Sequence, residues 1–264
     1  MAALDRFRLD GKVVLITGAG RGIGAGCARV FAEAGADVAI TARTLDQLDA
    51  VADEVRAFGC RALVVPGDVT DLAFLAEFVG RARADLGRID LVVNNAGGGG
   101  IGALLGVSAA ELESQFHFNV TTAFELTKLA IPHMLEAGGG SVVNISSFMG
   151  RMADRGFVAY GTAKAALAHM TRLMAFDCAP RIRINAIAVG SIATSALEGV
   201  LTMPVLRDEM VAKTPLGFIG VPEDIGLCAL YLASDAGRYV TGKVIECDGG
   251  TEAATLDLRI PDLS

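Results

Sequence analysis

The sequence predicts an α/β fold, in which a doubly wound parallel sheet of about seven strands carries helices on both faces. Short apolar runs rich in β-branched residues alternate along the chain with longer segments whose apolar residues recur at helical spacing. This alternation is typical of βαβ crossovers, which place all strands of a sheet parallel. The first strand-to-helix junction is also rich in glycine, as is usual where such a sheet binds a nucleotide.

Seven runs are expected to form strands, because each is short, apolar and followed by turn residues. They are residues 13–16, 37–41, 61–66, 89–93, 141–145, 183–189 and 244–247. Helices are expected between most of them, where apolar residues recur at spacings of three and four. The longest is expected over residues 108–135, where Ser108 and Glu111 form a capping box and Asn119 lies in the interior.

The composition indicates a single domain over residues 1–264. A chain of 264 residues with 52% hydrophobic and 20% charged residues is long enough to bury a large core, and no linker or repeat divides it. Residues 190–220 lose clean periodicity but stay rich in apolar side chains, as expected of a segment that covers a substrate. Residues 252–264 follow the last strand as a tail.

Charge and residue usage exclude several function classes. A net charge of −7 and a pI near 5.0 give no global basic field, so neither nucleic acid nor an anionic membrane surface is an expected partner. No apolar run reaches the roughly 18 residues of a membrane span, and the first residues lack a signal peptide, so we expect a cytoplasmic protein. The three histidines form no HxxxH pattern and the five cysteines no CxxC pair. Neither a metal site nor a disulfide framework is therefore expected.

The glycine-rich junction follows the first expected strand directly. Gly18, Gly22 and Gly24 stand in a GxxxGxG spacing between that strand and an amphipathic helix. Glycines let backbone amides approach an anion closely, and the free N–H groups at a helix N-terminus favour negative charge. The junction predicts a nucleotide site, although a plain tight turn would show the same glycines.

Tyr160 and Lys164 form a second candidate for chemistry. Side chains four apart lie on one face of a helix, so the ammonium is expected beside the phenol. A neighbouring cation favours the ionised phenol and lowers a pKa that starts at about 10. Such a phenol exchanges protons near neutral pH. The alternative is a solvated helix edge that merely carries these two residues.

Taken together, the motifs resemble those of the short-chain dehydrogenases/reductases, a family with a Rossmann-like fold. The resemblance covers about residues 7–251. It is carried, in chain order, by residues 17–24 (TGAGRGIG), Asp68-Val69, Asn94-Asn95-Ala96-Gly97, Asn119, Ser147, Tyr160, Lys164 and the closing Asp248-Gly249-Gly250. Ser147 precedes Tyr160 by the thirteen positions typical of the family, which distinguishes it from Ser146.

The resemblance implies four catalytic roles. Tyr160 would protonate or deprotonate the substrate oxygen while a hydride moves to or from a nicotinamide. Lys164 would lower the pKa of the phenol and hold the nicotinamide ribose. Ser147 would hydrogen-bond the substrate oxygen, and Asn119 would anchor a water that relays the proton. Alternatively, Ser147 caps a strand end and Asn119 satisfies backbone groups at a helix bend.

The resemblance also implies which residues bind the cofactor. They are Gly18, Arg21, Gly22, Ile23, Gly24, Arg43, Asp68, Val69, Asn95, Ala96, Gly97, Tyr160, Lys164, Ile192 and Thr194. Relatives that use NAD place an acid after the second strand to bind the ribose 2′-hydroxyl, but this chain has Ala42 there. Arg43 and Arg21 would instead hold a 2′-phosphate, so NADP(H) is favoured and NAD(H) is the alternative.

The expected activity is the interconversion of a secondary alcohol and a ketone. The apolar segment 197–218, with Phe148, Met149 and Met152, favours a lipophilic substrate such as a steroid, a terpenoid or an acyl chain, although a loop that packs on its own protein would look the same. One rival is a 3-oxoacyl thioester reductase, which would need a basic surface for its acidic carrier protein. The other is a non-catalytic sensor or scaffold that binds the nucleotide. The family resemblance implies a homotetramer.

Overall fold

The computed structural model describes residues 2–195, 197–256, 260 and 262. Within these residues, seven strands form one sheet in the order β3-β2-β1-β4-β5-β6-β7, and every neighbouring pair is parallel. The strands are β1 (Val13–Thr17), β2 (Asp37–Thr41), β3 (Ala62–Val64), β4 (Leu91–Asn94), β5 (Gly140–Ser147), β6 (Ile182–Val189) and β7 (Val244–Cys247). The predicted doubly wound parallel sheet is confirmed. The strand order reverses between β1 and β4, where such sheets bind ligands.

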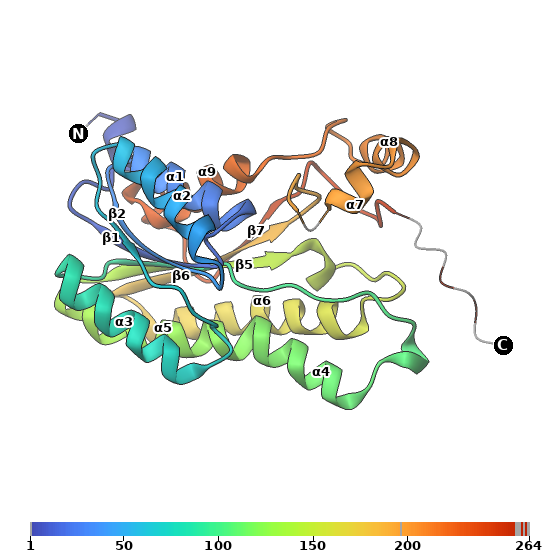
Figure 1. The fold of residues 1–264 in the computed structure, drawn as a ribbon, viewed down its shortest axis with the longest axis horizontal. Helices are drawn as coiled ribbons and strands as arrows, with labels where there is room; N and C mark the ends of the chain where they lie inside the picture. The colour runs from blue at the N-terminus through green and yellow to red at the C-terminus, as the bar shows by residue number, and fades with distance from the viewer. Residues whose placement is uncertain (1, 196, 257–259, 261, 263–264) are drawn as a thin grey trace.

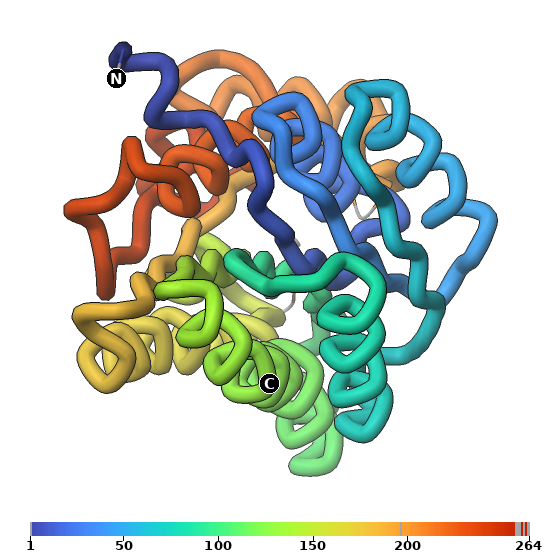
Figure 2. Tube along the Cα trace, turned by 90° about the vertical axis from the view of Figure 1, so that its left-hand side faces the viewer, coloured from blue at the N-terminus to red at the C-terminus, as the bar shows by residue number. Residues whose placement is uncertain are grey.

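Helices cover both faces of this sheet (Figure 1). One face carries α1 (Gly22–Glu33), α2 (Leu45–Ala57) and α9 (Pro222–Ala233). The other carries α3 (Leu72–Leu86), α5 (Thr122–Glu136) and α6 (Val158–Cys178), with α4 (Ala109–Phe116) extending beyond the sheet beside α6. Figure 2 shows the same two helical layers from the side. Residues 190–220, where the sequence loses clean periodicity, contain the short helices α7 (Glu198–Leu201) and α8 (Pro204–Ala212).

The first four residues of β1 are all apolar because both faces of this central strand are buried. Val14 and Ile16 of β1 pack into the core beneath α1 and α9, while Val13 and Leu15 pack into the core on the opposite face. All four are at most 1% exposed. Side chains alternate between the two faces of a strand, so only an uninterrupted apolar run fills both cores.

Several elements differ from the prediction in their bounds: the strand expected at residues 61–66 is shorter, Ala62–Val64, and the one expected at residues 141–145 is longer, Gly140–Ser147. The strand expected at residues 89–93 begins only at Leu91, because the Asp90 carboxylate accepts the Val13 N–H at 3.0 Å in place of a backbone carbonyl. The helix expected over residues 108–135 is interrupted by a π-helix at His117–Thr121, between α4 and α5. The N-terminus of α4 is as predicted, since the Ser108 hydroxyl accepts the Glu111 N–H at 3.1 Å.

Within the described part of the chain, no helix is long and apolar enough to cross a membrane. The five cysteines carry free thiols; Cys27 is buried and the others are partly buried.

Arg183 in β6 closes the end of α9. Its guanidinium donates hydrogen bonds of 2.6–3.2 Å to the carbonyls of Leu232, Ala233, Ser234, Gly237 and Val240. Replacing Arg183 by methionine keeps the apolar stem but removes all five hydrogen bonds, so we expect the free energy of unfolding to fall by about 2–3 kcal/mol. Chemical denaturation of the variant measures this loss.

Arg181→Met is the matched control, because Arg181 is exposed and its side chain makes no hydrogen bond within the described residues. A change below about 0.5 kcal/mol is expected for this control. Equal losses in the two variants would contradict a special role of Arg183.

Candidate active site

The glycine-rich turn between β1 and α1 has the geometry that its sequence predicts. Gly18 and Gly22 have φ angles of +64° and +56°, a left-handed conformation that glycine adopts without strain. A Cβ at Gly24 would collide with the carbonyl oxygen of Gly18. Ile23, between the last two glycines, packs its side chain against the core beneath α1. The first free amides of α1 therefore remain open to an anion.

A cavity of about 400 Å³ lies at this helix N-terminus. Of the predicted cofactor residues, Arg21, Gly22 and Thr194 line it. Thr194 lies close enough that a Cβ on Gly22 would come within 3.3 Å of its methyl group. Ile192, also predicted to bind the cofactor, is 6% exposed and packs its side chain in the core next to α9, so the side chain does not line the cavity and the role of Ile192 stays a prediction.

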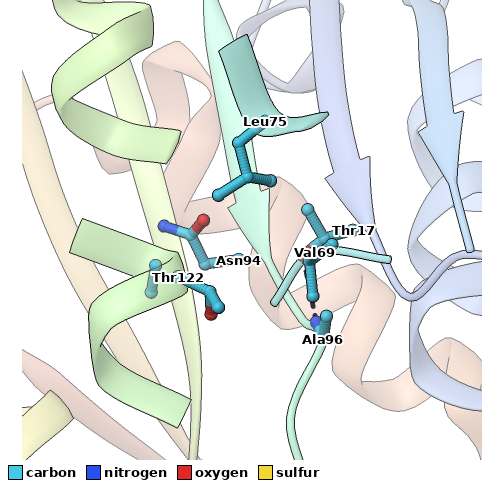
Figure 3. Close-up of a pocket in the computed structure, with 7 residues that line it drawn as sticks. Thr17, Val69, Leu75, Asn94, Ala96 and Thr122 are labelled. Carbon is cyan, nitrogen blue, oxygen red and sulfur yellow. Dashed lines mark hydrogen bonds between the residues drawn. The ribbon is translucent and has the colours of Figure 1, made fainter. Parts of the chain in front are cut away.

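The loops after β1 and β4 are tied together at the point where the strand order reverses. The Thr17 hydroxyl accepts the Asn95 N–H at 3.1 Å and the Ala96 N–H at 3.0 Å, and Figure 3 shows Thr17 beside Ala96. The Asn95 amide donates to the carbonyls of Thr17 and Gly18 at 2.9 and 3.1 Å. Val69 joins Thr17 and Ala96 in lining a small pocket behind the turn. No role was predicted for Thr17 from the sequence. The available signal was a hydroxyl at the end of the first strand, together with the Asn94-Asn95 pair at the end of a strand that neighbours it in the sheet.

The end of β2 carries positive charge and no carboxylate. Arg21 and Arg43 are exposed, and within the described residues neither forms an ion pair. Asp68 accepts the N–H and the hydroxyl of Thr70 at 2.9 and 2.8 Å. These bonds, together with the positive charge of Arg43, lower the pKa of the Asp68 carboxyl. The Thr41 hydroxyl at the end of β2 is buried, with no partner among the described residues.

Ser147, Tyr160 and Lys164 meet at the carboxyl end of β5. Ser147 is the last residue of that strand, and Tyr160 lies in the first turn of α6. Lys164 follows one turn later, with its Nζ 5.7 Å from the centroid of the tyrosine ring. The same Nζ donates to the Ile145 carbonyl at 2.9 Å. The prediction that both side chains occupy one helix face is confirmed.

The pKa shifts differ from the expectation. Burial raises the pKa of Tyr160, and a hydrogen bond with the Ser147 hydroxyl lowers it only in part. Burial also lowers the pKa of Lys164 from 10.5 to about 8. In the protein chain alone, the phenol thus has a pKa above its ordinary value, the opposite of the expected direction, because desolvation outweighs the hydrogen bond with Ser147.

Asn119 lies in the π-helix and is 1% exposed. Its side chain accepts the Gly98 N–H and donates to the Gly98 carbonyl, both at 2.9 Å, and donates to the Gln115 carbonyl at 2.9 Å. It therefore satisfies backbone groups at a helix bend, and the anchoring of a water stays a prediction. A Cβ on Gly97 would lie 2.8 Å from Asn119 Oδ1 and 2.9 Å from Lys164 Nζ, so this glycine lies against two of the four predicted catalytic residues.

Similarity to known proteins shows which family has this arrangement of residues. A family model described as enoyl-(acyl carrier protein) reductase matches residues 18–252. An uncharacterized oxidoreductase of Mycobacterium tuberculosis is 56% identical over 261 residues, which cover 98% of this chain and 99% of that protein. The crystal structure of a short-chain type dehydrogenase/reductase from Mycobacterium marinum superposes with a TM-score of 0.89 at 38% identity, covering 96% of this chain and 100% of that one. The chain belongs to the short-chain dehydrogenase/reductase family.

This short-chain dehydrogenase/reductase is also similar to 7α-hydroxysteroid dehydrogenases. The Escherichia coli enzyme is 39% identical over 250 residues, which cover 93% of this chain and 96% of that protein. A 7α-hydroxysteroid dehydrogenase solved in complex with NADH and 7-oxo glycochenodeoxycholic acid superposes with a TM-score of 0.92 at 36% identity, covering 97% of this chain and 100% of that one. The chain is therefore an NAD(P)-dependent dehydrogenase/reductase.

The residues present fit a nicotinamide dinucleotide. The glycine turn leaves no room for side chains where a pyrophosphate approaches, the cavity borders the open amides of α1, and the unpartnered Thr41 hydroxyl lies at the end of β2. Across the part of the chain that the structure describes, no group of three or more His, Cys, Asp or Glu side chains could hold a metal ion.

Proposed function

We propose that this enzyme interconverts a secondary alcohol and a ketone on a lipophilic substrate, and that it prefers NADP(H) to NAD(H). The observation that carries the reaction type is the Tyr160 phenol, hydrogen-bonded to the Ser147 hydroxyl, with the Lys164 ammonium one helical turn away. A phenol so placed gives a proton to a ketone oxygen or takes one from an alcohol, and the serine hydroxyl orients the same oxygen.

When bound, the nicotinamide supplies or accepts the hydride. The chain's own residues manage the proton. Lys164, with a pKa of about 8, is mostly protonated at neutral pH, and its charge favours the ionised form of Tyr160 when the alcohol is deprotonated. Asn119 lies next to Gly97 and Lys164, where a bound water would connect the ammonium to solvent.

Two segments at the carboxyl end of the sheet supply apolar surface for a substrate. Both lie at the right-hand end of the molecule in Figure 1. Their large apolar side chains are 53–83% exposed: Ile101, Leu104 and Leu105 after β4, and Met203, Val205, Leu216 and Phe218 after β6. Met149, expected beside them, is instead buried. Apolar side chains gathered at a site entrance favour a lipophilic ligand, and the similarity to enzymes named for a hydroxysteroid supports a steroid-like one.

The charge around β2 supports the cofactor preference. A 2′-phosphate needs cations, and Arg43 and Arg21 have no ion-pair partner among the described residues. The solved 7α-hydroxysteroid dehydrogenase holds NADH, so this preference rests on the residues of this chain alone.

Replacing Arg43 by alanine is expected to raise KM for NADP(H) about 10- to 100-fold, because a charge-assisted hydrogen bond is lost. KM for NAD(H), which lacks the phosphate, is expected to change less than about 3-fold. Steady-state kinetics with both cofactors measures the two effects. Equal changes for both cofactors would contradict a phosphate-binding role.

The function is tested by following nicotinamide absorbance with a panel of steroid, terpenoid and short-chain alcohols and ketones, plus an acetoacetyl thioester. Turnover of lipophilic alcohols or ketones with NADP(H) is the expected result. Preferential turnover of the thioester would favour the 3-oxoacyl reductase instead. To bind an acidic carrier protein the enzyme would need a basic surface, and Lys128 already pairs with Glu125. Tight cofactor binding without any turnover would favour a sensor.

A further inference from the structure

Arg151 joins the loop after Ser147 to the end of β7. It directly follows the short helix η4 (Phe148–Gly150), which begins at the residue after Ser147. Its guanidinium contacts the Glu246 carboxylate at 3.0 Å, the Asp248 carboxylate at 3.4 Å, the Thr251 carbonyl at 2.9 Å and the Glu252 carboxylate at 3.0 Å. One cation thus contacts three carboxylates and one carbonyl that lie in β7 and in the turn after it.

On one side, Arg151 is connected to the catalytic serine through η4. The Ser147 hydroxyl accepts the Met149 N–H at 3.1 Å, and the Arg151 N–H donates to the Phe148 carbonyl at 3.0 Å. Gly150 lies directly against α6, because a Cβ there would come within 2.9 Å of the Lys164 carbonyl carbon. The short helix is therefore held between Ser147 and the helix that carries Tyr160 and Lys164.

On the other side, the turn after β7 holds both ends of the segment 190–220. Gly190 donates its N–H to the Cys247 carbonyl at 3.1 Å and lies so close to Asp248 that a Cβ would meet its Cα at 2.5 Å. At the far end of the segment, the Leu216 N–H donates to the Gly249 carbonyl at 3.1 Å. The turn thereby fixes the residues that line the cavity and cover the substrate.

We infer that Arg151 is a positioning residue that fixes the Ser147 loop relative to the segment 190–220. The inference rests on the proposed function for its kinetic readout. Without Arg151, the carboxylates of Glu246, Asp248 and Glu252 face one another with no cation between them, and their repulsion separates the turn from η4. A small shift of a group that orients the substrate lowers turnover far more than cofactor binding.

The test compares Arg151→Gln, Arg151→Lys and Arg155→Gln with the wild-type enzyme. Arg151→Gln is expected to lower kcat about 10- to 100-fold, with the cofactor Kd from calorimetry within about 3-fold of wild type. Arg151→Lys is expected to restore part of kcat, because an ammonium keeps the charge but cannot reach all four acceptors at once. Arg155, in the same loop, contacts Ile260 and Asp262 at the tail. Its variant is therefore the matched control, with kcat expected within about 2-fold.

Hydrogen exchange separates this inference from the proposed function. Amides of residues 147–152 and 214–220 are expected to exchange at least about 10-fold faster in Arg151→Gln, but not in Arg155→Gln. Unchanged exchange in both segments would overturn the inference, even if no substrate were turned over by the wild-type enzyme. If the wild-type enzyme does turn over a substrate, an unchanged kcat of Arg151→Gln would overturn the inference as well. Should Arg151→Gln fail to fold, the same two readouts on Arg151→Lys decide the question.

Discussion

Replacing Tyr160 by phenylalanine is expected to lower kcat about 10³-fold, within the range for loss of a general acid or base. The variant keeps the aromatic ring that packs 5.7 Å from Lys164 Nζ and loses only the hydroxyl that bonds Ser147. The cofactor Kd is expected to stay within a few-fold of wild type. Steady-state kinetics on the best substrate of the panel, together with calorimetric titration of the cofactor, measures both quantities.

Tyr239→Phe is the matched control, because Tyr239 is fully exposed and far from any predicted site residue in the sequence. It is expected to leave kcat unchanged. If Tyr160→Phe kept more than a tenth of the wild-type kcat, the phenol would not be the group that transfers the proton.

Replacing Lys164 by methionine is expected to abolish most turnover and yet to stabilise the protein at pH 7. Burial lowers the pKa of Lys164 from 10.5 to about 8. Each pKa unit corresponds to about 1.4 kcal/mol, so the charged side chain costs the folded state about 3 kcal/mol. Methionine removes this cost, and the lost hydrogen bond to the Ile145 carbonyl offsets about 1 kcal/mol of the gain. A net stabilisation of about 2 kcal/mol at pH 7 follows.

The pH dependence of this gain identifies its origin. Below pH 8 the amine is protonated in the folded and unfolded states, and the full cost is present. Between the folded pKa of about 8 and the unfolded pKa of 10.5, only the unfolded state holds the proton. The stability of the wild-type protein therefore rises with pH relative to the variant in this window. Above it, the difference that arises from charge burial is gone.

Chemical denaturation of both proteins at pH 7, 9 and 10 measures this difference. Lys243→Met, at an exposed lysine, is the control and is expected to show no such trend. A lower stability of Lys164→Met than of the wild type at pH 7 would show that the buried lysine does not destabilise the folded state. In that case its burial would have to be offset by contacts other than the bond to Ile145.

The sequence predicts those features that local patterns determine. The run of residues 13–16 in β1 is apolar on both faces, so its composition alone placed this strand in a buried parallel sheet. Ser147, Tyr160 and Lys164 were predicted by their order and spacing, and the structure brings them together. Asp90 could not be predicted to replace a carbonyl of the sheet, because its partner Val13 lies far away in the sequence.

Other features depend on tertiary contacts that no local pattern shows. The direction of the Tyr160 pKa shift follows from burial, which depends on segments distant in the sequence. The side chain of Ile192 packs in the core beside its bridge to Gly220, a contact that no local pattern shows, and its role at the cofactor stays a prediction. Arg151 had no sequence signal, since its partners lie in and after the last strand.

The π-helix at His117–Thr121 restricts which insertions and deletions the gene can accept at this point of the chain. Each residue of an α-helix turns the following side chains by about 100°. Deleting one residue here would either rotate Leu126, Ala130 and Met134 of α5 away from the core or withdraw Asn119 from Gly98. We therefore expect insertions and deletions to be tolerated at surface turns such as the one at Gly138. In this helical turn we expect selection to remove them.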